Sequence, residues 1–134
     1  MSRVYSSRGA RPSASLCQAH RSSRVISSAI GVQCDVSDED NVAGAMRETL
    51  DRFGRLDCLV ANAGRTGKQS FTDMSLGEWH RVLQVNLDGA FLCLREAARV
   101  LVGQGQGGSV VGVSSTRAID GAPGQQHYAA SKTA

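Results

Sequence analysis

The sequence predicts an α/β fold, a doubly wound parallel sheet of three strands with flanking helices. Short apolar segments alternate with longer segments whose apolar residues recur every three or four positions, which is the pattern of strands followed by helices. The chain has 134 residues, 41% of them hydrophobic, which is enough for one modest core. It contains no apolar run near the roughly 18 residues that cross a bilayer, so we expect no membrane partner.

The first predicted strand and helix lie in residues 29–54. The apolar run at 29–36 predicts a strand. Ser37 is a favourable helix N-cap, and the acidic residues 38–40 fall in the first turn, where the helix dipole favours negative charge. Apolar residues follow at helical spacing, and Gly54 is expected to end the helix.

The rest of the chain predicts two more strands that alternate with helices. Strands are expected at 56–61 and 109–115, and helices at 76–83, 85–102 and 126–134. This alternation is typical of a partial Rossmann-like sheet with helices on its faces. Because few residues follow Gly124, the last helix would be too short to be stable in isolation.

The Gly-rich segment at 103–108 matches the pattern G-x-G-x-x-G of dinucleotide-binding loops. That pattern binds a pyrophosphate only where it follows a strand and opens a helix, because the phosphates lie on the helix N-terminus. Here the segment follows a predicted helix and precedes a predicted strand. We therefore expect a surface turn rather than a phosphate-binding loop.

Residues 1–28 form a basic leader that differs from the rest of the chain. Residues 1–34 contain five arginines and no acidic residue, and nine of the first 28 residues are serine. An organelle transit peptide would have this composition, and so would a phosphate-binding arm, although the aromatic interleaving of such arms is missing. We favour an unstructured or wrongly assigned start, predict no nucleic-acid partner, and place one domain at residues 29–134.

The four cysteines, Cys17, Cys34, Cys58 and Cys93, are widely and irregularly spaced. No pair forms a C-x-x-C motif, and the three histidines do not cluster with them. This spacing predicts no metal site and no disulfide framework. Reduced thiols are typical of the cytosol, so we expect a cytoplasmic protein.

The chemically informative residues are Ser115, Tyr128 and Lys132. Residues four positions apart share one helix face, so the Tyr128 phenol and the Lys132 ammonium would lie side by side. The ammonium would favour the phenolate form, which makes the phenol a usable acid near neutral pH. A serine at the end of the preceding strand could hold a substrate oxygen against that phenol. Taken alone, the pair could equally be a surface Tyr and Lys.

Four segments, in this order and on these elements, resemble the short-chain dehydrogenase/reductase family over residues 29–134. The matching segments are Asp35-Val36 after Cys34, Asn62-Ala63-Gly64 after a strand, Val85-Asn86-Leu87, and Ser115 followed at the family's spacing by Tyr128-x-x-x-Lys132.

The resemblance implies a catalytic group and a cofactor-binding group. The catalytic group is Asn86, Ser115, Tyr128 and Lys132. The cofactor-binding group is Asp35, Val36, Asn62, Ala63 and Gly64, together with Tyr128 and Lys132.

Each residue has an implied role. Tyr128 would be the general acid in reduction and the base in oxidation, and Lys132 would support it and hydrogen-bond the nicotinamide ribose. Ser115 would orient the substrate carbonyl, and Asn86 would hold a water that links Lys132 to solvent. Asp35 would contact the adenine ring, and the segment 62–64 would form the floor of the cofactor site, where a glycine allows close approach.

Three of these residues have a purely structural alternative. Asn62 could only stabilise a strand end, Asn86 could be a helix N-cap, and Asp35 could be a turn residue. His127, next to the predicted catalytic Tyr, could line the pocket, but we assign it no role.

The resemblance implies an enzyme, an NAD(P)-dependent oxidoreductase that interconverts an alcohol and a ketone or 3-oxoacyl group by hydride transfer. The cofactor would be NAD or NADP, the substrate a small alcohol or carbonyl compound, and the full-length form a homo-oligomer. The family's Gly-rich turn after its first strand has no counterpart here, and its segments beyond Lys132 are missing. We therefore expect the chain as given to be inactive. The alternative is a non-catalytic fragment that retains only an oligomerisation surface.

Overall fold

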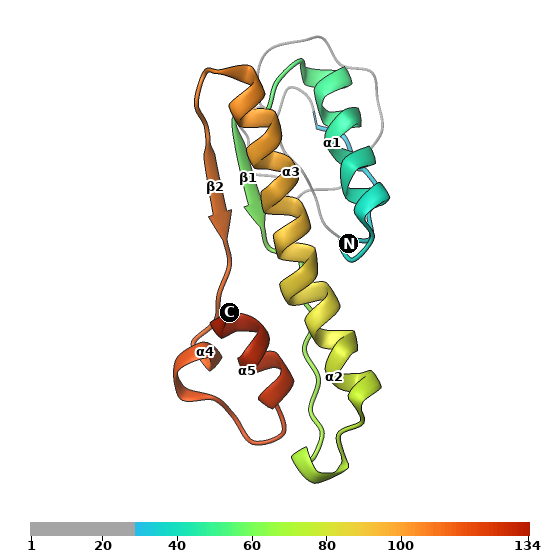
Figure 1. Cartoon of the computed structure of the whole chain (residues 1–134), viewed down its shortest axis with the longest axis vertical. Helices are drawn as coiled ribbons and strands as arrows, with labels where there is room; N and C mark the ends of the chain where they lie inside the picture. The colour runs from blue at the N-terminus through green and yellow to red at the C-terminus, as the bar shows by residue number, and fades with distance from the viewer. Residues whose placement is uncertain (1–28) are drawn as a thin grey trace, which may run out of the picture.

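The computed structural model describes residues 29–134, so the predicted leader lies outside the described residues. Its elements are α1 (Glu39–Phe53), β1 (Cys58–Ala61), the 3-10 turn η1 (Phe71–Asp73), α2 (Leu76–Leu83), the π-helix η2 (Gln84–Asp88), α3 (Gly89–Gln104), β2 (Ser109–Gly112), α4 (Arg117–Asp120) and α5 (Gln126–Thr133). Figure 1 shows β2, β1, α3 and α1 at one end of the molecule and α2, α4 and α5 at the other.

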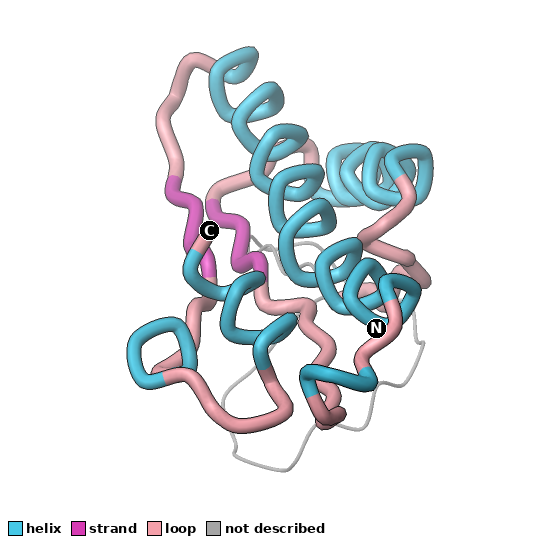
Figure 2. The backbone as a smooth tube through the Cα atoms, turned by 60° about the horizontal axis from the view of Figure 1, so that its bottom comes forward, coloured by secondary structure: helices cyan, strands magenta, loops and turns pink. Residues whose placement is uncertain are grey.

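The two strands pair in parallel, with Cys58 opposite Ser109 and Ala61 opposite Gly112. Helix α3 packs on both strands, and α1 packs on α3 (Figure 2). Parallel strands joined through helices confirm the predicted α/β class. On the other face of the sheet, the side chains of Val60 and Val111 are about half exposed, so the described residues cover only one face.

The first predicted strand, at residues 29–36, is wrong as a strand. The segment contains no strand residues. Its side chains nevertheless alternate, since Val32 and Cys34 are half-buried, Val36 is buried, and the residues between them are exposed. The sequence pattern correctly indicated an extended segment with one buried face. It could not indicate a backbone partner, and among the described residues only β2 pairs with β1.

Helix α1 begins one residue later than predicted. Its N-cap is Asp38, whose carboxylate accepts a 2.8 Å hydrogen bond from the Asn41 backbone N–H. Ser37 instead donates its hydroxyl hydrogen to Asp35, at 2.7 Å. The C-terminal end is as predicted, because Gly54 adopts a left-handed conformation (φ 76°) that favours glycine.

The core lies between α1, β1 and α3. Its buried members are Met46, Leu56, Leu59 and Ala97, and partly buried side chains of α3 pack against them.

The predicted Gly-rich turn at residues 103–108 is confirmed as a turn between α3 and β2. There the Gln104 side chain accepts from the Leu56 N–H (2.7 Å) and donates to its carbonyl (2.8 Å), as a neighbouring strand would.

Helix α5 is held by tertiary contacts, which explains why so short a helix forms. It packs on α2 and α4. The Ser114 hydroxyl donates to the Lys132 carbonyl at 2.7 Å, and the Lys132 ammonium donates to the Val113 carbonyl at 2.7 Å. These bonds tie the helix to the chain that leaves β2. No helix within residues 29–134 has the length and apolar character to span a membrane.

Candidate active site

Three segments distant in sequence meet beyond the carboxyl ends of the strands, the edge at which ligands bind in parallel sheets. They are the loop after β1, the π-helix η2, and α5. A Cβ atom built on Gly64 would lie 3.6 Å from Asn86 Oδ1 and 3.8 Å from Lys132 Nζ. The structure therefore brings the predicted Asn-Ala-Gly loop, Asn86 and Lys132 together.

Asn86 is buried and connects the three segments. Its Oδ1 accepts a 2.6 Å hydrogen bond from the Arg65 N–H, and its Nδ2 donates to the Arg65 carbonyl (2.8 Å) and to Ser131 Oγ (2.9 Å). The helix-cap alternative is wrong, because η2 continues α2 into α3 without a break. Single π-turns inside helices often occur at functional sites, and this one directs an amide sideways into the loop.

Tyr128 and Lys132 lie one turn apart on α5, as predicted. Within residues 29–134 no hydrogen bond fixes the half-buried Tyr128 phenol, whereas its backbone carbonyl accepts from Ser131 Oγ at 2.8 Å. The phenol is therefore available to a ligand.

Ser115 follows β2, as predicted, but its hydroxyl is used locally. It accepts a 3.2 Å hydrogen bond from the Arg117 N–H at the start of α4. No hydrogen bond joins Ser115 and Tyr128 among the described residues, so the substrate-orienting role of Ser115 stays a prediction.

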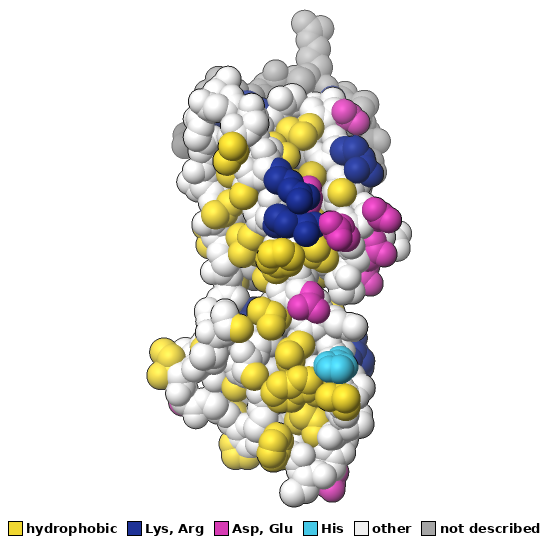
Figure 3. Space-filling model, viewed as in Figure 1, with side chains coloured by type: hydrophobic (Ala, Val, Ile, Leu, Met, Phe, Trp, Pro, Cys, Tyr) yellow, Lys and Arg dark blue, Asp and Glu magenta, His cyan; other side chains and the backbone are white. Residues whose placement is uncertain are grey.

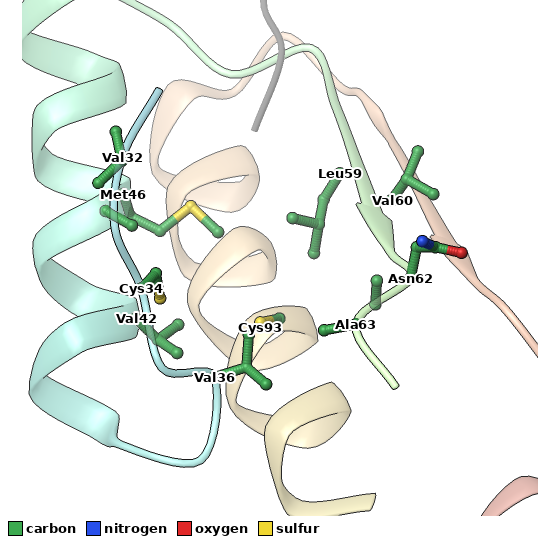
Figure 4. Close-up of a pocket in the computed structure, with 12 residues that line it drawn as sticks. Val32, Cys34, Val36, Val42, Met46, Leu59, Val60, Asn62, Ala63 and Cys93 are labelled. Carbon is green, nitrogen blue, oxygen red and sulfur yellow. The ribbon is translucent and has the colours of Figure 1, made fainter. Parts of the chain in front are cut away.

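Four of the other predicted cofactor-binding residues lie together beside the loop that follows β1. Asp35, Val36, Ala63 and Gly64 line one open pocket of about 670 Å³. Gln33, Asn41, Arg65 and Val85 complete its walls, with Cys34. Asn62 lies instead at the edge of an adjacent apolar groove, and Figure 4 shows its amide directed away from the groove's aliphatic residues.

Asp35 is a turn residue, and its contact with an adenine ring stays a prediction. Its Oδ1 accepts from the Ser37 hydroxyl and from the Ser37 N–H (3.0 Å), which makes it a turn residue. These hydrogen bonds lower the pKa of Asp35, which is exposed and ionised at neutral pH. No hydrogen bond within the described chain uses its Oδ2, which leaves one carboxylate oxygen for a ligand in the pocket.

The apolar groove holds two thiols, Cys34 and Cys93 (Figure 4). Burial raises the pKa of Cys93 to about 11, with a smaller contribution from Cys34. Burial, followed by the nearby Asp35 charge, also raises the pKa of Cys34. Both thiols are therefore protonated at neutral pH, and neither is a nucleophile.

Sequence analysis missed two residues of the site. Arg65 supplies the backbone groups that bind Asn86 and also lines the larger pocket. Ser131, inside the Tyr-x-x-x-Lys motif, links α5 to η2. Neither residue carries a signal in hydrophobic spacing, because each acts through hydrogen bonds between segments far apart in sequence.

Comparison with known proteins identifies the family. A family model described as short chain dehydrogenase matches residues 2–134. The uncharacterized oxidoreductase YohF of Escherichia coli is 41% identical over 103 residues, which are 77% of this chain and 41% of that protein. A 3-oxoacyl-(acyl-carrier-protein) reductase of Synechocystis is 38% identical over 104 residues, 78% of this chain and 42% of that protein.

A solved structure supports the same family assignment. The chain superposes on an NAD+-bound xylitol dehydrogenase with a TM-score of 0.70 and 32% identity, covering 75% of this chain and 38% of that one. This chain therefore spans about two-fifths of the length of the curated relatives it matches. On its sequence, its fold and the order of its site segments, it belongs to the short-chain dehydrogenase family.

Proposed function

We propose that this chain carries part of the active site of an NAD(P)-dependent oxidoreductase that interconverts an alcohol and a ketone or 3-oxoacyl group. The observation that carries the proposal is the meeting of three separate segments at Gly64, with Asn86 Oδ1 and Lys132 Nζ both within 4 Å of its Cβ position. A side chain at position 64 would project toward the Lys132 ammonium, so glycine keeps this space open.

The residues present fit the adenosine and nicotinamide-ribose ends of a dinucleotide. The pocket beside Asp35 and Val36 has a free carboxylate oxygen next to a buried aliphatic side chain, which suits a purine with its attached ribose. Lys132, on α5 beside Gly64, would hold the ribose of the nicotinamide. Hydride transfer is the chemistry that a nicotinamide supplies when bound.

The chain's own residues would handle the proton. Tyr128 would donate its phenolic proton to the carbonyl oxygen in reduction and recover it in oxidation. The Lys132 ammonium, one helical turn away, would stabilise the phenolate that remains. Ser115 would hold the carbonyl oxygen once its hydroxyl turns from the Arg117 N–H. Asn86 Oδ1 accepts one hydrogen bond, from the Arg65 N–H, so its second lone pair remains for a water, whereas both amide hydrogens are already used.

The names of the relatives support this substrate class. One is a reductase of 3-oxoacyl groups and another a dehydrogenase of xylitol, a polyol. Both names describe the conversion between a hydroxyl and a carbonyl carbon. We propose the same conversion here, with NAD or NADP.

A chimera tests the proposal. Residues 29–134 would replace the corresponding segment of the Synechocystis reductase, whose remaining segments supply the parts this chain does not match. We expect oxidation of NADPH or NADH that depends on a 3-oxoacyl or ketone substrate. A folded chimera that binds the cofactor but reduces no carbonyl compound would contradict the proposal.

A second candidate is a non-catalytic chain that only associates with other copies. It is favoured by large apolar side chains that remain exposed, among them Phe91, Val102 and Ile119, at 56%, 81% and 90%. Figure 3 shows apolar side chains over both ends of the molecule. We propose that the complete protein is a cytoplasmic homo-oligomer. Both candidates predict association of the chimera in sedimentation, so carbonyl reduction separates them: the second candidate predicts association without it.

A further inference from the structure

One buried histidine beside the candidate site has no hydrogen-bond partner. His127 is 0% exposed, and neither ring nitrogen has a partner within the described structure. A buried polar group without a partner costs free energy, so its retention needs a reason. His127 immediately precedes Tyr128 and lies in the first turn of α5.

A carboxylate from α2 lies close to this imidazole. Glu78 Oε1 lies 3.7 Å from His127 Nε2, which is longer than a hydrogen bond but within reach after a small adjustment. The other oxygen of Glu78 is bound by the Arg81 guanidinium, so the carboxylate is held in place. Helices α2 and α5 pack against each other at this point.

A glycine in the loop after β1 makes this approach possible. A Cβ atom on Gly67 would lie 2.9 Å from Glu78 Oε1 and 3.0 Å from His127 Nε2. Such a methyl group would crowd both side chains at once, so that at least one of them would have to shift. Three segments therefore meet at the pair: α2, α5 and the loop that also carries Gly64.

The first turn of α5 lacks a side-chain cap. Its N-cap, Gln125, makes no capping hydrogen bond with its side chain. The last turn is fixed by hydrogen bonds from Asn86 to Ser131 and from Lys132 to the Val113 carbonyl. At the start of the helix, the Gln125 side chain donates a 3.2 Å hydrogen bond to Thr66. A carboxylate near a helix N-terminus is also favoured by the helix dipole.

We propose that His127 is a positioning residue that, paired with Glu78, fixes the first turn of α5 and so orients the Tyr128 phenol. This inference rests on the proposed role of Tyr128 as proton donor. His127 itself touches no reacting atom. The pair sets the rotation of α5 about its axis, while Ser131 and Lys132 set its distance from η2 and β2.

The test follows the environment of Tyr128 directly. The chain has only two tyrosines, so a Tyr5→Phe background labelled with 3-fluorotyrosine gives one fluorine resonance, that of Tyr128. Gly67→Ala places a methyl group against both Glu78 and His127 without changing a residue of α5. Gly31→Ala is the matched control, because nothing lies within 4 Å of its Cβ position.

We expect a shifted or doubled Tyr128 resonance in Gly67→Ala and in Glu78→Gln, and an unchanged resonance in Gly31→Ala. His127→Leu and His127→Gln both remove the ring, so their comparison isolates the polar contact. The Gln side chain can still donate to Glu78, and we expect it to preserve the single resonance that Leu loses. Spectra are recorded below the unfolding transition of each variant, so that a loss of stability alone leaves them unchanged.

An unchanged Tyr128 resonance in both Gly67→Ala and Glu78→Gln would overturn the proposal, as would identical behaviour of His127→Gln and His127→Leu. Because the readout is spectroscopic, it is independent of catalysis. If the chimera lacks activity while these shifts are seen, the proposed function fails and the positioning contact stands.

Discussion

At the scale of single residues, Asn86 contributes most to the geometry of the site. Its amide satisfies both backbone groups of Arg65 and the hydroxyl of Ser131, and so connects a loop, a π-helix and α5. Its identity followed from family resemblance, but its hydrogen bonds could not be predicted. They join residues up to 45 positions apart in sequence.

Replacing this amide should destabilise the chain. In Asn86→Ala the Arg65 backbone groups lose their partners, and we expect the free energy of unfolding to fall by about 1–3 kcal/mol. Asn62→Ala is the control, because Asn62 is exposed and should change stability by about 0.5 kcal/mol or less. Urea denaturation of both variants measures the difference. Equal effects would mean that the Asn86 contacts do not contribute to folding.

Two carboxylates give the chain an acid-sensitive stability. Hydrogen bonds from Ser37 lower the pKa of Asp35, and hydrogen bonds from Asn41 lower the pKa of Asp38, both from an ordinary 3.8. A lowered folded-state pKa means that their contribution is complete above pH 3.8 and is lost as the pH falls through the folded-state value. We expect stability to decline in this acid range. Asp38→Asn keeps a capping oxygen but cannot titrate, so urea midpoints of this variant should fall less on acidification.

At the scale of elements, hydrophobic spacing predicted every helix that packs on the core, and the two strands that pair. The segment 29–36 marks the limit of that signal. The alternation of apolar and polar residues in this segment indicated that one face is buried, and that face lies against α3. Burial alone does not determine whether the backbone pairs with another strand. The N-cap of α1 shows a similar limit, because Ser37 and Asp38 are both good caps and only the Asp35 turn decides between them.

The contact between residues 29–36 and α3 can be tested at Gly89. A Cβ atom there would lie 2.7 Å from Val36 Cγ2 and 3.2 Å from the Val36 carbonyl. We expect Gly89→Ala to lower the free energy of unfolding by about 1–3 kcal/mol by overpacking. Adding Val36→Ala should recover part of this loss, because the smaller side chain makes room.

The matched control is Gly44→Ala in α1. Its new methyl group would make only an ordinary 3.7 Å contact, so a gain of up to about 1 kcal/mol from helix propensity is expected. Additive effects of Gly89→Ala and Val36→Ala would show that the segment does not lie against α3 in solution.

At the scale of the whole molecule, α2, η2 and α3 form one continuous helical column, with the core packed against α3 and the candidate site at η2, in the middle of the column (Figure 1). The π-turn η2 lies where the column passes the loop after β1. Substitutions that disrupt Asn86 should therefore alter the site before they unfold the core.

The chain by itself should bind the cofactor weakly. We propose an adenosine pocket and a ribose contact for the described residues, but their only G-x-G-x-x-G segment follows α3 instead of opening a helix after a strand. We expect no measurable NADH or NADPH binding by calorimetry at micromolar concentrations. Micromolar affinity for either dinucleotide would mean that another part of the chain binds the phosphates.

The most direct test of the proposed function is the kcat for carbonyl reduction by the chimera and by its Tyr128→Phe variant. The variant keeps the ring and removes only the hydroxyl, so cofactor binding should persist while reduction is lost almost completely, because no other group is placed to donate the proton. Ser115→Ala should lose less activity, because this residue transfers no proton. If Tyr128→Phe retains most of the activity, the proposed mechanism is contradicted.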